Sequence, residues 1–113
     1  MHWFQLSPLE VPALPVRRAA RADRNQAEIV KTLRKLGASV QLLHTIGQGC
    51  PDLMVAVAGG GTFAVEIKDG RLPPSKQRLT PAEQSWKDSW RGQYVVLNSV
   101  EGAVLFFRWA RGI

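Results

Sequence analysis

Three charged side chains of both signs lie in the most apolar part of this sequence. Residues 51–69 read PDLMVAVAGGGTFAVEIKD, two apolar runs around three glycines, and they include Asp52, Glu66 and Lys68. The glycines predict a hairpin turn. Side chains alternate along a strand, so the three charged residues share one face and the apolar residues share the other. Two carboxylates and one ammonium are therefore expected to meet at one end of the hairpin.

Two carboxylates that meet on one face of a hairpin repel each other and raise each other's pKa unless a cation lies between them. Lys68 is one candidate cation, which would make the group a structural ion-pair cluster. A divalent metal is the other candidate, and oxygen ligands in this number suit Mg²⁺. The backbone carbonyl of Ile67 is a candidate third protein ligand. Such a site is suited to phosphodiester hydrolysis, in which the metal activates water and Lys68 stabilises the transition state.

The hairpin must hold these side chains in register. We predict its strands at about 52–58 and 63–68, with the three glycines as the turn. Centring the turn on Gly60 pairs Met54 with Glu66. The apolar face of the hairpin can then pack against helices.

Upstream, four apolar residues recur at helical spacing and predict a first helix. They are Ile29, Val30, Leu33 and Leu36. Asn25, with Glu28 three residues later, resembles a capping box, but the arginine-rich residues before Asn25 also allow an earlier start. Gly37 fits the end of the helix. A strand over 38–44 and a glycine-bearing loop over 45–51 lead into the hairpin.

Downstream, residues 71–79 contain two prolines and three basic residues without periodicity, which predicts an exposed loop. A second helix should follow, because Thr80 fits the cap, a proline follows it, and Glu83 stands at the third position. This helix contains Trp86 and Trp90, which we assign to the core.

The C-terminal part predicts a strand over 93–98 and a helix over 99–112, although the β-branched and aromatic content of 99–112 leaves a strand open. The order α, β, β, β, α, β, α indicates an α/β fold, with a mixed central sheet flanked by helices. The chain has 113 residues, enough for one domain. We expect an extended proline-bearing arm over 1–16 and a single domain over 17–113.

Charge and composition limit the classes of binding partner and the cellular location that we expect. The net charge of +6 suits a polyanion such as nucleic acid, and a solvated basic surface is the alternative. No apolar run has the length of a membrane helix, so no membrane partner is expected. A single cysteine, Cys50, and the absence of a signal-peptide pattern fit a cytoplasmic protein.

The charged residues also carry a resemblance to a known family. Pro51 and Asp52, followed after thirteen residues by Glu-Ile-Lys at 66–68, resemble the PD-(D/E)XK nuclease signature. The context adds a Gly-Gln-Gly-Cys-Pro-Asp loop, a Lys-Asp-Gly turn and a Leu-Thr-Pro-Ala-Glu-Gln-Ser-Trp helix start. Over about residues 25–105 the sequence resembles the VRR-NUC branch, especially small stand-alone forms of phages and prophages. The resemblance implies a restriction-endonuclease-like αβββαβ core.

The resemblance also implies site roles. Asp52 and Glu66 match the family's metal-binding carboxylates and Lys68 its catalytic lysine, with Mg²⁺ or Mn²⁺ as the cofactor. The Ile67 carbonyl stays a candidate third ligand.

Two further residues on the predicted helices have open alternatives. Glu28 matches an acidic residue that family members often carry on the first helix, which would make it a metal ligand. The alternative is a helix cap that pairs with Lys31 or Thr32. The family also places a glutamine on the helix after the hairpin. Gln84 fills that position in one register, and Glu83 fills it when the helix is aligned on Trp86.

These features predict a metal-dependent endonuclease that hydrolyses phosphodiester bonds in duplex or branched DNA by direct attack of water. Holliday-junction resolvases in the family suggest a branched substrate by analogy. Arg71, Lys76 and Arg78 would contact phosphates, and a solvated loop is the alternative. Two rival hypotheses are a binding module on the same fold that does not cleave, and a structural protein with an ion-pair cluster.

Paired cuts favour a homodimer, because one such centre cuts one strand and the chain has room for one centre. Candidate contact residues are Trp3 and Phe4 in the arm and Phe106, Phe107 and Trp109 in the terminal helix. Alternatively, these aromatic residues all fill the core of a monomer.

Overall fold

A computed structural model describes residues 16–43 and 46–113, with side chains from Arg24 onward. The elements are α1 (Val16–Leu36), β1 (Ser39–Leu42), β2 (Leu53–Val57), β3 (Gly61–Ile67), a 3₁₀ turn (Pro74–Lys76), α2 (Pro81–Ser89), β4 (Gln93–Leu97) and α3 (Val100–Arg111). The predicted order of helices and strands is confirmed. The predicted arm over 1–16 lies outside the described residues except for Val16, which begins α1.

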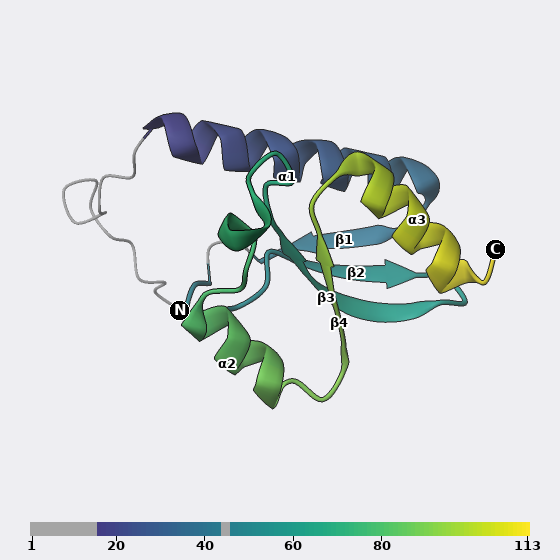
Figure 1. The fold of residues 1–113 in the computed structure, drawn as a ribbon. Coiled ribbons are helices and arrows are strands. Elements are labelled where there is room, and N and C mark those ends of the chain that lie inside the picture. The colour runs from purple at the N-terminus through teal and green to yellow at the C-terminus, as the bar shows by residue number, and fades with distance from the viewer. Residues whose placement is uncertain (1–15, 44–45) are drawn as a thin grey trace, which may run out of the picture.

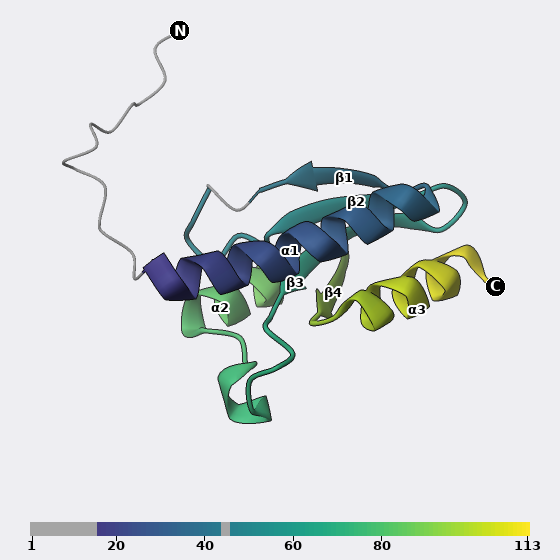
Figure 2. The same ribbon diagram turned by 90° about the horizontal axis from the view of Figure 1, so that it is seen from above.

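The four strands form one mixed sheet in the order β1-β2-β3-β4. Strand β2 is antiparallel to both β1 and β3, and β4 lies parallel to β3. Figures 1 and 2 show α1 and α3 on one face of the sheet and α2 on the other. We call these the core face and the α2 face. Within the described residues, no helix is long and apolar enough to span a bilayer.

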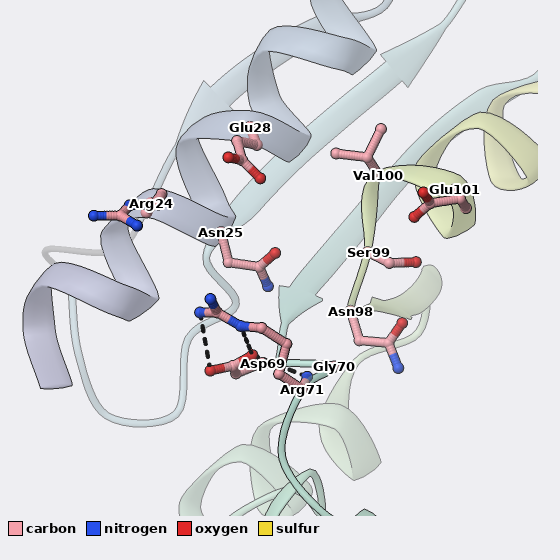
Figure 3. Close-up of a pocket in the computed structure, with 10 residues that line it drawn as sticks. All are labelled: Arg24, Asn25, Glu28, Asp69, Gly70, Arg71, Asn98, Ser99, Val100 and Glu101. Carbon is pink, nitrogen blue, oxygen red and sulfur yellow. Dashed lines mark hydrogen bonds and ion pairs between the residues drawn. The ribbon is translucent and has the colours of Figure 1, made fainter.

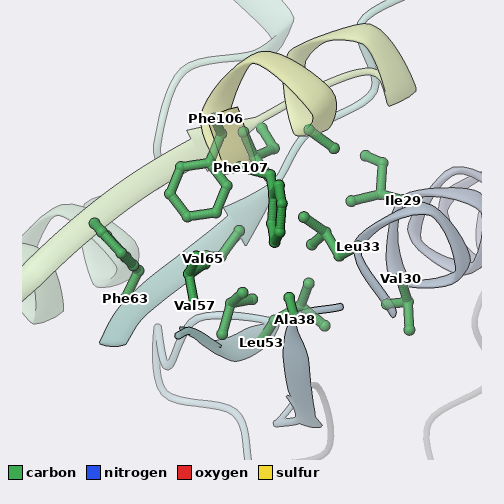
Figure 4. Packing of buried hydrophobic residues seen from close by; sticks show 13 residues of the cluster. Ile29, Val30, Leu33, Ala38, Leu53, Val57, Phe63, Val65, Phe106 and Phe107 are labelled. Carbon is green, nitrogen blue, oxygen red and sulfur yellow. The ribbon is translucent and has the colours of Figure 1, made fainter. Parts of the chain in front are cut away.

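The core face holds the hydrophobic core (Figure 4). Its buried side chains come from α1, β2, β3, β4 and α3, and include Ile29, Leu33, Leu53, Val55, Val57, Phe63, Val65, Leu97, Phe106 and Phe107. The rings of Phe63 and Phe106 meet edge to face with centroids 4.9 Å apart. The apolar face predicted for the hairpin therefore packs against the helices, as expected.

The predicted hairpin register is wrong by one pleat. Val57 pairs with Gly61, and Met54 pairs with Ala64 instead of Glu66. Positive φ angles at Gly59 (75°) and Gly61 (100°) close the turn nearer β2 than the centre of the glycine run. The shift moves each partner by two residues, so each side chain stays on its predicted face.

Of the two helix starts that the sequence left open, the earlier one is observed: α1 begins at Val16, nine residues before Asn25, so Asn25 does not cap it. Residues 16–24 are rich in alanine and arginine, which favour helix, and nothing there interrupts it. Asn25 lies inside the helix, where its side-chain amide donates a hydrogen bond to the Lys68 carbonyl (2.7 Å). This hydrogen bond connects α1 to the end of β3.

Helix α2 begins as predicted but does not join the core. Thr80 and Glu83 form the complete capping box, and the helix ends at Ser89, before the predicted end near Gly92. None of its residues is buried. Trp86 and Trp90 stack with centroids 4.8 Å apart on the α2 face. The assignment of both tryptophans to the core is wrong, since the core face is already filled by α1 and α3.

The terminal segment is a helix, as favoured. The Ser99 side chain caps α3 by accepting a hydrogen bond from the Gly102 N–H (3.0 Å). Phe106 and Phe107 are buried in the core, whereas Trp109 is 66% exposed. The loop over 71–79 is mostly exposed, as predicted, and contains the short 3₁₀ turn.

Candidate active site

Asp52 and Glu66 meet on the α2 face at the open end of the hairpin. Leu53 pairs with Val65, so one residue further along this register Asp52 lies level with Glu66. The Ile67 N–H donates a hydrogen bond to Asp52 Oδ2 (2.8 Å). This bond holds the Asp52 carboxylate against β3, beside the Glu66 side chain.

Glu66 is a buried carboxyl with an unpaired oxygen. The residue is 3% exposed, and Oε2 has no hydrogen-bond partner among the described residues. Burial, followed by the charge of Asp52 and hydrogen bonding with Asp52 and Glu83, raises the pKa of Glu66 to about 10. Without a cation, the carboxyl is therefore held in its acid form.

The Lys68 ammonium does not supply that cation. Its Nζ lies 2.6 Å from Glu83 Oε1, and the described residues show no ion pair from it to Asp52 or Glu66. Burial alone would raise the pKa of Glu83, but hydrogen bonds from Lys68 and the Thr80 N–H outweigh it and lower that pKa. The sequence offered Lys68 and a divalent metal as the neutralising cation, and Lys68 is paired with Glu83 instead.

The residues present fit a divalent metal. Mg²⁺ takes oxygen ligands and is usually held by one or two carboxylates, with waters and phosphate oxygens completing its shell. Asp52 and Glu66 supply two carboxylates, and the orphaned Glu66 oxygen needs a positive partner. The Ile67 N–H points toward Asp52. In a strand, the N–H and the carbonyl of one residue point to the same side, so the Ile67 carbonyl also points toward Asp52. The described part of the chain holds no group of three or more His, Cys, Asp or Glu side chains arranged for a metal.

Two other polar groups border the carboxylates. Burial, followed by the charges of Glu66 and Asp52, raises the pKa of the Cys50 thiol. The Tyr94 hydroxyl is buried and has no hydrogen-bond partner among the described residues. Burial raises its pKa as well, and the charges of Glu66, Glu83 and Asp52 add to this effect. The α2 face therefore gathers several acidic groups in a partly desolvated region.

Glu28 does not join this pair. It is exposed on α1 and lines a cleft of about 620 Å³ that neither Asp52 nor Glu66 lines (Figure 3). The cleft lies between α1, the segment after β3 and the start of α3. The Arg71 guanidinium at its rim has a raised pKa, chiefly through its hydrogen bond with Asp69 and the charge of Asp69, with a smaller contribution from Glu28.

The two candidates for the helix position separate in the structure. Gln84 is exposed, and its side-chain amide donates to Asp88 Oδ1 (2.8 Å) on the same helix. Glu83 instead faces the sheet, where it accepts from Lys68. The residues alone predict a capping role for Glu83, and the resemblance offers it for the helix position only when the helix is aligned on Trp86. Its distance from Trp86, one helical turn, is the signal that points to the site.

The basic loop keeps its three predicted phosphate-contact residues at the surface. Arg71, Lys76 and Arg78 are all exposed. Arg71 is fixed by Asp69, whose Oδ1 accepts from the Arg71 backbone N–H (3.0 Å) and from Nε (3.1 Å). The role of these residues in DNA binding stays a prediction.

Comparisons with known proteins give a fold. No protein-family model matches the sequence, and no curated protein matches it. A solved structure described as a VRR_NUC domain is similar, with a TM-score of 0.59 and 24% identity. The match covers 78% of this chain and 95% of that one. Phage or prophage origin stays a prediction. The chain has the α/β fold of a VRR_NUC domain, as its resemblance implied.

Proposed function

We propose that this protein is a divalent-metal-dependent nuclease that hydrolyses phosphodiester bonds in DNA. The observation that carries the proposal is the buried Glu66 carboxyl, which lies beside a second carboxylate and whose Oε2 has no hydrogen-bond partner among the described residues. Burying two acids together without a partner is unfavourable, and such strained ionisable pairs cluster at functional sites. The VRR_NUC fold supports the same conclusion.

The roles follow from the chemistry of each group. Asp52, Glu66 and the Ile67 carbonyl would hold the ion, with Mg²⁺ or Mn²⁺ as the fitting metals. When bound, a divalent ion supplies Lewis acidity toward water and phosphate oxygens. Lys68 lies two residues from Glu66 and carries three donors for the negative charge that develops on the phosphate.

Cleavage assays with purified variants test this proposal. Labelled duplex, four-way junction and single-stranded DNA would each be incubated with Mg²⁺, Mn²⁺ or EDTA. We expect Asp52→Ala and Glu66→Gln to lower the rate by roughly 10³-fold or more, and Lys68→Ala by about 10²-fold.

Glu101→Gln removes an exposed carboxylate of α3 and should cut normally, as a matched control. Undiminished cutting by a pure Glu66→Gln variant would reject the site. DNA binding without metal-dependent cutting by the wild type would identify a binding module instead.

The basic loop should hold the DNA backbone. If Arg71, Lys76 and Arg78 contact phosphates, the triple alanine variant should bind all sequences more weakly. The slope of log affinity against log salt should shrink by about one unit for each lost contact. An unchanged slope would show that the loop is only a solvated surface.

A homodimer would supply the two centres needed for paired cuts in a duplex or a junction. An apolar pair on α3 supports it, since Leu105 (66% exposed) and Trp109 (66%) lie four residues apart on one side of the helix, and the exposed Ile113 (72%) follows just beyond its end. Light scattering should give twice the 12.5 kDa chain mass at micromolar concentration. Leu105→Glu should reduce it to one chain, and a wild-type mass of 12.5 kDa would reject the dimer.

A further inference from the structure

One carboxylate oxygen connects the start of α2 to the candidate catalytic lysine. Glu83 Oε1 accepts a hydrogen bond from the Thr80 N–H (2.8 Å) and also lies 2.6 Å from Lys68 Nζ. Both side chains of the ion pair are largely shielded, with 14% exposure for Lys68 and 17% for Glu83. The pair is therefore better ordered than a surface salt bridge, where solvent and side-chain entropy remove most of the benefit.

Within the described residues, α2 also meets β4 through side chains that are not fully buried, including Lys87, whose Nζ lies 5.6 Å from the centroid of the Tyr94 ring. The helix buries no residue, and its Trp86 ring lies 6.1 Å from the Tyr94 ring of β4. The Lys68–Glu83 pair is consequently a principal attachment of the first turn of α2. It also fixes where the Lys68 ammonium lies.

Three carboxylates compete for this single ammonium. Glu66 and Lys68 share the α2 face of one strand, and Glu66 feels the charges of both Asp52 and Glu83. Of these three acids, Glu83 alone forms the ion pair with Lys68 among the described residues. If Glu83 were absent, the Asp52 and Glu66 carboxylates of the same cluster would be the competing acceptors for the ammonium. An ammonium there would take the place of a metal, because both cations neutralise the same two carboxylates.

We propose that Glu83 is a positioning residue that holds Lys68 at the start of α2 and so keeps the Asp52–Glu66 pair open to a divalent cation. The inference rests on the proposed function, because it takes this carboxylate pair as the metal site. It assigns Glu83 a second role beside the capping box. It also explains why a charged side chain, in place of a neutral glutamine, suits this position.

The affinity for Mn²⁺, measured by calorimetry without DNA, tests the inference separately from cleavage. Glu83→Ala should lower the affinity by about 10- to 100-fold, the range seen when residues that support metal ligands are removed. Adding Lys68→Ala to that variant should restore most of the affinity, because the competing ammonium is gone. This reversal is a coupling that a purely structural Glu83 would not produce.

Two further variants complete the design. Thr80→Ala removes the hydroxyl that caps α2 but leaves the Glu83 carboxylate, so it should destabilise the protein and change Mn²⁺ affinity less than about twofold. Glu83→Gln keeps a neutral acceptor for Lys68 and should lose only roughly two- to fivefold in affinity. If Glu83→Ala fails to fold, Glu83→Gln with and without Lys68→Ala makes the same comparison.

Equal Mn²⁺ affinity in the wild type, Glu83→Ala and the double variant would overturn the inference. A wild-type protein that binds neither Mn²⁺ nor Mg²⁺ would overturn it too. Normal metal binding with the predicted reversal, but no cleavage of any DNA, would support the inference and reject the nuclease instead.

Discussion

The two faces of the sheet follow opposite rules, although the same strands build both. On the core face, Leu53, Val55 and Phe63 are buried against other apolar side chains. On the α2 face, Glu66 is also buried, yet its Oε2 has no hydrogen-bond partner in the described part of the chain. Alternation along a strand makes this division possible, because neighbouring residues point to opposite faces.

The difference shows where stability is gained and where it is given up. Burying apolar surface contributes about 25 cal/mol per Å², so the core face stabilises the fold. Burying an uncompensated carboxyl is unfavourable until a proton or a cation neutralises it. Removing a buried apolar side chain from the core face should therefore destabilise the fold, whereas neutralising the buried Glu66 carboxyl on the α2 face should stabilise it.

The largest effect is expected on the core face. Phe63→Ala should lower the free energy of unfolding by about 3–5 kcal/mol, because it leaves a cavity beside Phe106. Urea denaturation measures this loss. Val96→Ala is the matched control, since Val96 is a half-exposed strand residue on the α2 face and should lose less than about 1 kcal/mol. Equal losses at the two positions would contradict the division of the sheet.

Glu66→Gln should stabilise the metal-free protein. The pKa of Glu66 rises from 4.5 to about 10 on folding, so between these values the folded protein holds a proton that the unfolded chain has released. Wild-type stability should consequently fall as the pH rises through this window and be highest near or below its acid end. An amide cannot ionise, so the variant should gain about 1–3 kcal/mol at pH 8.

Urea denaturation in EDTA between pH 4 and 9 measures this difference. The two proteins should approach each other at pH 4, and Mg²⁺ should stabilise only the wild type, by about 2.7 kcal/mol at 100 times its dissociation constant. A variant that is less stable than the wild type at pH 8 would show that the carboxylate is well compensated without metal.

Local sequence signals predicted the elements because each signal depends on neighbouring residues. The capping box at Thr80 and Glu83 and the serine cap of α3 are such signals, and both are confirmed. Strand alternation likewise predicted which face Glu66 occupies. The hairpin register escaped prediction because three consecutive glycines allow more than one turn geometry.

Long-range contacts explain the remaining differences. Asn25 carries a capping signal, but a hydrogen bond to the Lys68 carbonyl, 43 residues away, uses its side chain inside α1. Glu83 and Gln84 are adjacent, and only the packing of α2 on the sheet decides which one meets Lys68. The exposure of Trp90 follows from the same packing, because α1 and α3 already fill the core.

The smallest effect is expected at Tyr94, where removing the hydroxyl and removing the ring should change the free energy of unfolding by different amounts. The centroid of the ring lies 6.1 Å from the centroid of the Trp86 ring and 5.6 Å from Lys87 Nζ, and Tyr94→Phe keeps both contacts. The hydroxyl is buried without a described partner, so its removal should change the free energy of unfolding by less than about 0.5 kcal/mol or raise it slightly. Urea denaturation in EDTA measures the change, and Tyr94→Ala, which also removes the ring, should lose clearly more. A loss above about 1 kcal/mol in Tyr94→Phe would mean that the hydroxyl is hydrogen-bonded in solution. The buried polar groups of the α2 face would then have more hydrogen-bond partners than the unpaired Glu66 oxygen suggests.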